Sequence, residues 1–178
     1  NGNTATQVTR TVEVVDNTPP TASNPPDINV ECLAAVPDAD PAVVTDEADS
    51  CGTPVVTFFS QTADPAVNDG TITRTYRVDD GNGNTIDVYQ NIIINDVTAP
   101  VITLTGANPQ SIEACASYTE LGATASDNCA GDISGSIVID ASAVNTAVEG
   151  TYTVTYNVVD GNGNTATQVT RTVEVVDN

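Results

Sequence analysis

Apolar and polar residues alternate along several stretches of the chain, most clearly in residues 151–158. Tyr152, Val154, Tyr156 and Val158 alternate there with threonines and an asparagine. A period of two is typical of a β-strand that has one buried and one solvent-exposed face. The pattern therefore predicts a strand over residues 151–158.

The sequence DGNGN follows this strand, and a second apolar stretch follows it in residues 165–176. Asn-Gly is a strong turn signal, so the two stretches predict a β-hairpin. Residues 71–78, the turn at Asp80 and residues 85–95 repeat the same plan. The chain is therefore expected to contain two hairpins of the same kind.

Shorter stretches rich in β-branched residues lie between turn-forming residues, and no stretch carries apolar residues at helical spacing over a dozen positions. The pattern predicts further strands at residues 28–32, 42–45, 55–59, 101–105, 111–114, 119–125 and 136–140. Short strands with frequent turns are typical of an all-β protein built from β-sandwiches.

Two arginines do not fit the apolar faces of the hairpin strands. Arg74 stands where the second hairpin has Val154, and Arg171 interrupts an apolar face of valines. A bulge, or a position at the rim of the sheet, is expected at both arginines.

The stretch NGNTATQVTRTVEVVDN occurs twice, as residues 1–17 and as residues 162–178, which gives a period of 161. A repeat of this kind predicts a window cut from a longer tandem array. Within the period, related sequences at Asp16, Asp96 and Asp177 lie 80 and then 81 residues apart. The repeating unit is therefore expected to hold two related modules.

These boundaries divide the chain into three parts. Residues 1–17 are expected to be the closing strand of a preceding module, followed by a first module at residues 18–97 and a second at residues 98–178. Roughly seven short strands in a module of this length are typical of an immunoglobulin-like sandwich. The predicted fold class is thus all-β, with tandem immunoglobulin-like β-sandwiches.

Several motifs, taken in order, resemble a known family. PPDINVEC, DSC, TITRTYRVDDGNGNT and IIINDVTAP in the first module resemble a hyalin repeat (HYR) domain. LGATASDNC and GTYTVTYNVVDGNGNTATQVTRTVEVVD resemble the related immunoglobulin-like domains found in tandem on bacterial surface proteins, notably of Bacteroidetes. The resemblance implies an extracellular β-sandwich that acts as a spacer or adhesion module and has no catalytic residues. Hyalin repeats often hold a further cysteine near the last hairpin, which this chain lacks.

The four cysteines fall two in each module, Cys32 with Cys51 and Cys115 with Cys129. Their spacings match no CxxC redox or zinc pattern, and the chain has no histidine to complete a zinc site. Of the three possible pairings, only one bond inside each module repeats with the modules, so disulfides Cys32–Cys51 and Cys115–Cys129 are expected. Disulfides imply an oxidising, extracellular setting. The alternative is two buried free thiols in each module.

The net charge is −20, from 24 acidic residues and four arginines. Nucleic acids and anionic membranes require a basic patch, so neither is an expected partner. No apolar run reaches the ~18 to 20 residues of a membrane helix, so direct membrane insertion is not expected either. Divalent cations are the natural counter-charge, although the acidity is also explained by solubility or adaptation to salt.

In an immunoglobulin-like sandwich, the entering linker, a middle loop and the last hairpin turn meet at one end of the domain. Each module carries acidic residues and asparagines in all three segments, and carboxylate and amide oxygens are the ligands that calcium prefers. The alternative is that Asp, Asn and Gly are simply the residues that make turns. The expected calcium ligands are Asp16, Asp46, Asp49, Asp80 and Asn82 in the first module, and Asp96, Asp127, Asp160 and Asn162 in the second.

An enzyme is not expected, because the chain lacks histidine and lysine and its carboxylates lie in turns.

The sequence predicts a structural repeat unit of an extracellular fibre or surface stalk, stiffened by calcium between modules and disulfides within them. Its expected partners are neighbouring copies of the same repeat, end to end. One alternative is an adhesin that binds surface glycans through loops such as residues 61–70. Another is a subunit that polymerises by donating residues 1–17 to a neighbour.

Overall fold

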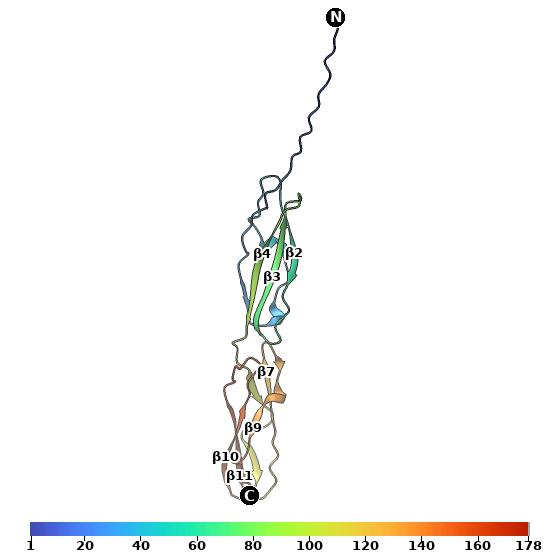
Figure 1. Ribbon diagram of the computed structural model, residues 1–178. Helices are drawn as coiled ribbons and strands as arrows, with labels where there is room; N and C mark the ends of the chain where they lie inside the picture. The colour runs from blue at the N-terminus through green and yellow to red at the C-terminus, as the bar shows by residue number, and fades with distance from the viewer. Residues whose placement is uncertain (178) are drawn as a thin grey trace. The chain divides into compact units, whose positions relative to one another are not determined.

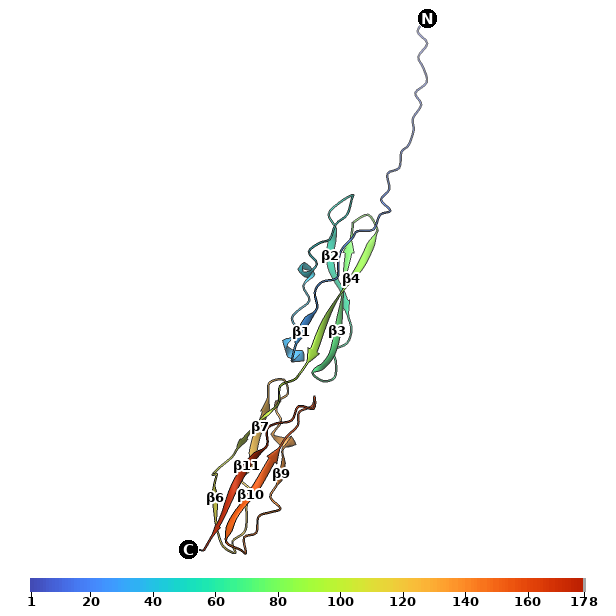
Figure 2. The ribbon, with the colours of Figure 1, turned by 90° about the vertical axis from the view of Figure 1, so that its left-hand side faces the viewer.

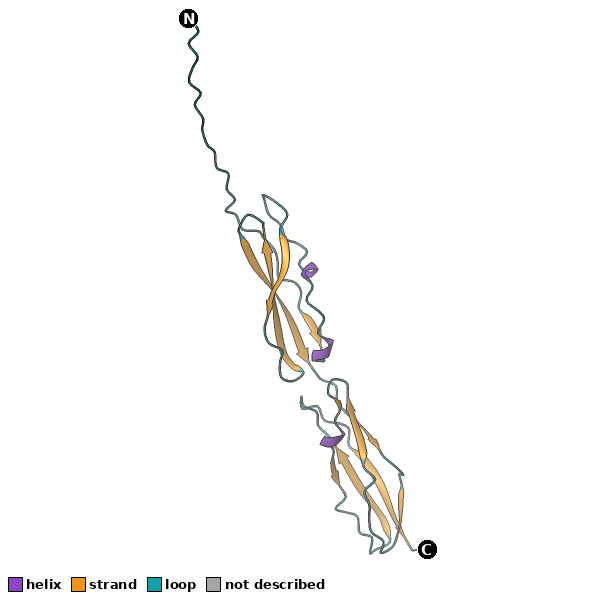
Figure 3. Ribbon diagram, turned by 90° about the vertical axis from the view of Figure 1, so that its right-hand side faces the viewer, coloured by secondary structure: helices purple, strands orange, loops and turns teal. Residues whose placement is uncertain are grey.

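The computed structural model describes residues 1–177, and their regular structure consists of strands and three short 3-10 helices (Figure 3). The fold is therefore all-β. The chain divides into two compact units whose boundaries do not follow the sequence modules. The first unit comprises residues 1–26, 39–60 and 74–90, and the second comprises residues 27–38, 61–73 and 91–178.

The first module forms one four-stranded sheet in the order β1-β4-β3-β2 (Figure 1). Its strands are β1 (Ile28–Val30), β2 (Val55–Gln61), β3 (Asp69–Asp79) and β4 (Thr85–Asn95). Buried and more exposed residues alternate along β3 and β4, as the sequence pattern predicts for both strands. The short strand β1 runs parallel to β4, with Val30 opposite Ile94.

The first module has no second sheet among the residues that the structure describes. Two 3-10 helices, η1 (Leu33–Ala35) and η2 (Pro41–Val43), lie in the segment between β1 and β2. The strand predicted at residues 42–45 is therefore wrong. Pro41 has no amide hydrogen to give to a sheet, and Oδ1 of Asp40 accepts a hydrogen bond of 2.9 Å from the amide of Ala42. Both features favour a tight turn.

The second module forms two sheets, as expected for a sandwich (Figure 2). One sheet has the order β6-β11-β10-β9 and the other the order β5-β7-β8. Its strands are β5 (Val101–Leu104), β6 (Gln110–Glu113), β7 (Ala123–Asp127), β8 (Gly131–Asp132), β9 (Val138–Asp140), β10 (Gly150–Asn157) and β11 (Val169–Val176). A third 3-10 helix, η3 (Ser134–Ser136), follows β8.

The hairpin predicted in the second module is present, since β10 and β11 pair in an antiparallel register. Val154 and Tyr156 of β10 and Val173 of β11 are fully buried, and Ile102 and Ala125 of the other sheet join the same cluster. The alternating pattern in the sequence thus marks the residues that fill the space between the two sheets.

Arg171 is buried in this core, so its expected place at a rim or a bulge is wrong. It lies in regular register opposite Val154 and is 0% exposed. Its guanidinium donates to Oε1 of Glu120 at 3.0 Å and to the carbonyl oxygens of Thr105 and Gly122. These acceptors allow the charge to be buried. Arg74 is likewise buried, at 4% exposure.

Residues 1–17 form an extended segment that pairs with no strand in residues 1–177 (Figure 1). Val8, Val12 and Val14 are 91%, 73% and 91% exposed. The identical residues 162–177 include β11, where Val173 and Val175 are buried. The same sequence thus adopts a strand only where neighbouring strands cover it.

The structure contains one disulfide among the described residues, and it joins Cys32 to Cys129 with the Cα atoms 5.1 Å apart. Cys51 and Cys115 are free and exposed. The predicted pairings Cys32–Cys51 and Cys115–Cys129 are therefore wrong. One disulfide rather than two is present, and it connects the segments predicted as separate modules.

The reason lies in where the strands end. Because β1 is parallel to β4, Cys32 lies beside the end of β4, close to the chain that continues to Asp96. Cys115 lies beside the C-terminal end of β11, where the amide of Ala114 donates to the carbonyl of Val176. Cys129 lies toward the opposite end of this strand. The eight residues of β11 span roughly 26 Å at ~3.3 Å each, which is too far for a bond between Cys115 and Cys129.

Candidate metal sites at two acidic poles

The second unit contains a cluster of acids that we call the second pole: Glu31, Asp96, Asp127 and Asp160. Asp96 directly follows β4, Asp127 ends β7, and Asp160 begins the turn between β10 and β11. The sequence predicts that Asp96, Asp127 and Asp160 converge, and the structure brings them together. Oxygen atoms of Asp96 and Asp127 lie within 4.8 Å of each other and of the Cys129 sulfur.

Two carboxylates of the second pole are buried with only part of their hydrogen bonding satisfied. Asp96 is 5% exposed, and its Oδ1 accepts from the amide of Thr98 at 3.1 Å. Asp127 is 9% exposed, and its Oδ1 accepts from the amides of Cys129 and Ala130, both at 2.8 Å. The Oδ2 atom of each is buried and has no hydrogen-bond partner in the described chain. A buried charge without a partner is costly, so both oxygens are available as ligands for a cation.

The electrostatics of Asp96 agree with this geometry. Burial is the main factor that raises the pKa of its carboxyl group, and the negative charges of Asp127, Asp160 and Glu31 raise it further. The hydrogen bond from Thr98 acts in the opposite direction. A divalent cation would remove the repulsion that raises this pKa.

Asp160 has a different role, because the turn itself occupies both of its oxygens. Its Oδ1 accepts from the amides of Asn162 (2.9 Å) and Asn164 (2.8 Å), and its Oδ2 accepts from the Asn164 side chain at 2.8 Å. Burial acts to raise the pKa of Asp160, but these hydrogen bonds outweigh it and lower the pKa. Asp160 therefore shapes the turn, as the turn-forming alternative holds, and adds charge to the second pole. The side-chain nitrogen of Asn162 is buried without a partner in the described chain.

Glu31 belongs to the second pole although sequence reasoning did not select it. Its Oε2 accepts from the hydroxyl of Thr98 at 3.0 Å and from the side chain of Asn128 at 2.8 Å. It directly precedes Cys32, whose partner Cys129 lies at the same pole. The sequence places Glu31 directly before Cys32, but this position indicates the second pole only when the partner of Cys32 is known to be Cys129.

The first unit contains a cluster of the same design, which we call the first pole: Asp16, Asp49 and Asp80. Oxygens of Asp16 and Asp49 lie within 4.8 Å of each other and of the Cys51 sulfur. Oδ1 of Asp49 accepts from the amide of Cys51 at 2.7 Å, while Oδ2 of Asp49 and Oε2 of Glu47 are buried without a partner in residues 1–177.

The turn of the first pole also repeats that of the second. Oδ1 of Asp80 accepts from the amides of Asn82 (2.7 Å) and Asn84 (3.0 Å), and its Oδ2 accepts from the Asn84 side chain. Burial acts to raise the pKa of Asp80, but the bond from the Asn84 side chain and the backbone bonds outweigh it and lower the pKa. The side chain of Asn82 donates to Oδ2 of Asp16 at 3.2 Å. Asp16, Asp49, Asp80 and Asn82 thus come together as the sequence predicts.

Asp46 is the predicted ligand that the structure does not place in a cluster. It is exposed, and its Oδ1 accepts from the amide of Ser23 at 2.9 Å. This hydrogen-bonding, mainly with Ser23, lowers the pKa of Asp46. Its neighbour Glu47 carries the buried oxygen instead, because successive side chains of an extended chain point to opposite sides.

Exposed aromatic side chains near the loop at residues 61–70 are already engaged. The guanidinium of Arg77 lies 3.7 Å from the ring centroid of Phe59, and Phe58 packs edge-on against Tyr76 at 6.1 Å.

No helix in residues 1–177 has the length and apolar character needed to cross a membrane.

The all-β fold and the disulfide agree with an extracellular structural or adhesive domain, and two family models indicate the same class. Residues 20–94 match the family model "HYR-like domain with 4 cysteines", and residues 102–175 match "Bacterial surface protein, Ig-like domain". The matches confirm the resemblance to hyalin-repeat and bacterial immunoglobulin-like surface domains. Both families are non-enzymatic surface domains, which agrees with the expectation that the chain is not an enzyme and indicates the cell surface or the extracellular space.

Comparison with solved structures finds partial similarity. The lipoprotein BT2262 from Bacteroides thetaiotaomicron is 28% identical over 44% of this chain and 38% of that protein, with a TM-score of 0.38. The human Desmocollin-1 ectodomain is 12% identical over 90% of this chain and 41% of that protein, with a TM-score of 0.31. The chain thus spans about two fifths of the length of each. No curated protein sequence matches the chain.

Proposed function

We propose that the chain is a structural repeat unit of an extracellular fibre or surface stalk and that each acidic pole binds calcium. The observation that carries the proposal is the recurrence of one design in two places. Each pole combines a linker aspartate, an Asp-x-Cys turn and an Asp-Gly-Asn-Gly-Asn turn, and each holds at least one buried carboxylate oxygen without a hydrogen-bond partner in residues 1–177.

The chemistry of the donors fits calcium better than a softer metal. Calcium takes six to eight oxygen ligands, and every pole offers carboxylate oxygens from separate segments of the chain. Cys129 is not a ligand, because its sulfur is in the disulfide with Cys32. The residues that would hold the ion are Asp96, Asp127 and Glu31 at the second pole, and Asp16 and Asp49 at the first.

Both poles include the residue that links one module to the one before it, Asp16 or Asp96. A cation bound there would join the linker to the loops of the module that follows. Neighbouring copies of the same repeat, arranged end to end, would then be the partners of this chain. A stiffened linker is what a spacer in a fibre or stalk requires.

Calcium titration by calorimetry tests the proposal. The wild-type chain is expected to bind calcium, Asp127→Asn to lose the second site, and Asp127→Asn combined with Asp49→Asn to lose both. Asp64→Asn, which removes the same charge from an exposed position outside both poles, is the control and should bind as the wild type does. Equal binding by all four proteins would contradict the proposal.

Strand donation between separate chains is a second candidate function, favoured by residues 1–17. Their three most exposed valines occupy the positions that are buried or half-buried in β11. A neighbour that lacks its closing strand would bury them. The mass of the intact fibre under denaturing, reducing conditions distinguishes the candidates: one very large species means a continuous repeat chain, and a species near 18 kDa means separate subunits.

A further inference from the structure

The bonded and the free cysteines occupy equivalent places in the two modules. Cys32 lies two residues after β1, which is parallel to β4, and Cys115 lies two residues after β6, which is parallel to β11. Each therefore lies beside the end of the last strand of its own module. We call this place the exit end of the module.

Cys51 and Cys129 are also equivalent, and both belong to poles. Each is the third residue of an Asp-x-Cys turn in which the cysteine amide donates to Oδ1 of the aspartate, at 2.7 Å for Cys51 and 2.8 Å for Cys129. The observed disulfide thus joins the exit end of the first module, through Cys32, to the pole of the second module, through Cys129.

The two free cysteines occupy the same two kinds of position as the bonded pair. Cys115 lies at the exit end of the second module, and Cys51 lies at the pole of the first. Residues 162–178 repeat residues 1–17 letter for letter, so the module that follows residue 178 in an array begins at Thr18 of another copy. Cys51 of that copy would then face Cys115 of this one as Cys129 faces Cys32.

We propose that Cys115 of one copy and Cys51 of the next form a disulfide, so that every joint of the array is covalently bonded. The inference deepens the proposed function and rests on it, because it requires copies arranged end to end. Its partner is a second copy of this chain, either the next repeat of one polypeptide or a separate subunit.

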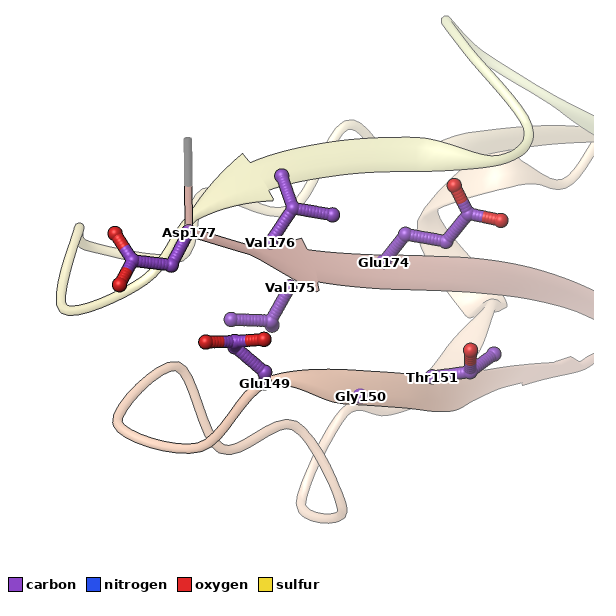
Figure 4. A pocket seen from close by; sticks show the side chains of 7 residues that line it. All are labelled: Glu149, Gly150, Thr151, Glu174, Val175, Val176 and Asp177. Atoms are coloured by element: carbon purple, nitrogen blue, oxygen red, sulfur yellow. The ribbon is translucent and has the colours of Figure 1, made fainter.

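The exit end of the second module also presents the other parts of a pole. Asp177 lies just beyond β11 and is exposed, at the position that Asp16 and Asp96 occupy before their modules (Figure 4). It borders an open pocket lined by Glu149, Gly150, Thr151, Glu174, Val175, Val176 and Asp177 (Figure 4). The acidic linker residue of a further joint is therefore in place beside Cys115.

One local difference separates the two exit ends. Glu31 and Cys32 are adjacent, whereas Ala114 stands between Glu113 and Cys115. Cys115 adopts a left-handed backbone conformation with φ of 65°, and its amide donates to the carbonyl of Thr146 at 2.7 Å. The turn thus accommodates the additional residue and leaves the thiol exposed.

The bond forms by thiol–disulfide exchange with a small disulfide such as oxidised glutathione. The thiolate of Cys51 attacks one glutathione sulfur and releases a first molecule of reduced glutathione. The thiolate of Cys115 from the other copy then attacks the Cys51 sulfur of this mixed disulfide and releases the second. Two protein thiols lose two electrons and two protons, and one glutathione disulfide gains them.

The test uses a head-to-tail fusion in which Thr18 of a second copy follows Asn178 of the first. Because residues 162–178 and 1–17 are identical, this fusion holds two complete overlapping copies. It is folded with calcium in a glutathione redox buffer, labelled with iodoacetamide and digested without reduction. We expect a peptide that links Cys51 to Cys115, with label on half of the Cys51 and half of the Cys115, because each copy then keeps one free thiol.

A Cys51→Ser change in the second copy alone should abolish the linked peptide and leave the remaining Cys51 and both Cys115 labelled. Label on all four free thiols of the unchanged fusion, or linkage of Cys51 to Cys32, would overturn the disulfide. Hydrogen exchange of residues 49–52 separates the two proposals. Two populations of this segment that exchange at different rates, together with free thiols, would contradict the disulfide and leave end-to-end stacking standing. A single exchange rate and free thiols would contradict both.

Discussion

Arg171 and Glu120 form the most deeply buried ion pair that the structure shows in the second unit. The arginine side chain is 0% exposed, and Glu120 also accepts hydrogen bonds from the hydroxyls of Tyr118 and Tyr156. Burial, together with Glu120, raises the pKa of Tyr118 to about 12 and raises that of Tyr156 further. The core of the second module is thus organised around a charged network rather than around apolar residues alone.

Replacing Arg171 with Leu is expected to lower the free energy of unfolding by about 3–5 kcal/mol, because it leaves Glu120 as an uncompensated, partly buried charge. Urea denaturation measures the change. Arg77→Leu is the matched control: it removes an arginine that pairs with Asp87 at 2.8 Å on the surface and should cost far less. Equal losses in the two variants would contradict the structural role of Arg171.

The same network predicts a pH dependence. Burial acts to raise the pKa of Glu120, but hydrogen bonds from Tyr118, Tyr156 and the Gly122 amide, with the charge of Arg171, lower it below its ordinary value of 4.5. The resulting stabilisation is present above pH 4.5 and is lost as the pH falls through the lowered pKa. The stability difference between wild type and Glu120→Gln should therefore shrink in acid, which urea denaturation at several pH values measures.

Asp96 is expected to behave in the opposite way when calcium is absent. Its raised pKa means that ionisation destabilises the folded state, so that stability is lost as the pH rises through the raised pKa. Asp96→Asn should then raise Tm by a few degrees at neutral pH in excess chelator and remove the part of the stabilisation by calcium that comes from the second pole. Thermal unfolding with and without chelator measures both effects. A Tm for Asp96→Asn below that of the wild type, both in chelator, would contradict the electrostatic account.

At the scale of single residues, the sequence was sufficient where the fold class determines which turns meet. Asp127 and Asp160 lie at one pole, as predicted, because the turns of a sandwich meet at one end. Glu31 was missed because it follows β1, far in sequence from the other residues of the pole. It lies there because Cys32 is bonded to Cys129, and that pairing depends on tertiary structure. Arg171 was misplaced because its acceptors, Glu120, Thr105 and Gly122, lie about 50 or more residues away in the sequence.

At the scale of elements, residues 1–17 and β11 show how far local sequence determines a strand. The two stretches are identical, yet only the second pairs with neighbours, because β6 and β10 flank it. The predicted hairpins and their alternating faces were confirmed for β3, β4, β10 and β11. The predicted strand at residues 42–45 failed where Pro41 and the side chain of Asp40 favoured a turn.

Deleting residues 1–15 is expected to leave the Tm of the isolated chain unchanged, because their exposed valines bury almost no surface in it. The deletion keeps Asp16 and with it the first pole. Thermal unfolding in calcium measures the effect. A fall of more than about 5 °C, which corresponds to roughly 1 kcal/mol, would mean that the segment packs against its own chain.

At the scale of the whole molecule, the repeat predicts the geometry of the array. The sequence predicts a closing strand over residues 165–176, of which the structure shows 169–176 as β11, and twelve extended residues would span roughly 40 Å at ~3.3 Å each. Two modules end to end should therefore advance a fibre by about 80 Å per repeat, which electron microscopy of the intact fibre measures. An axial repeat near half that value would mean that the modules pack side by side.

The central claim, calcium at both poles, is tested most directly by calorimetric unfolding of the 178-residue chain in excess calcium and in excess chelator. Calcium that binds only the folded state stabilises it by about 2.7 kcal/mol per site at a hundredfold excess over Kd. We therefore predict a clearly higher Tm in calcium than in chelator, reduced in Asp127→Asn and retained in Asp64→Asn. Superimposable unfolding curves for the wild-type chain in calcium and in chelator would contradict the account.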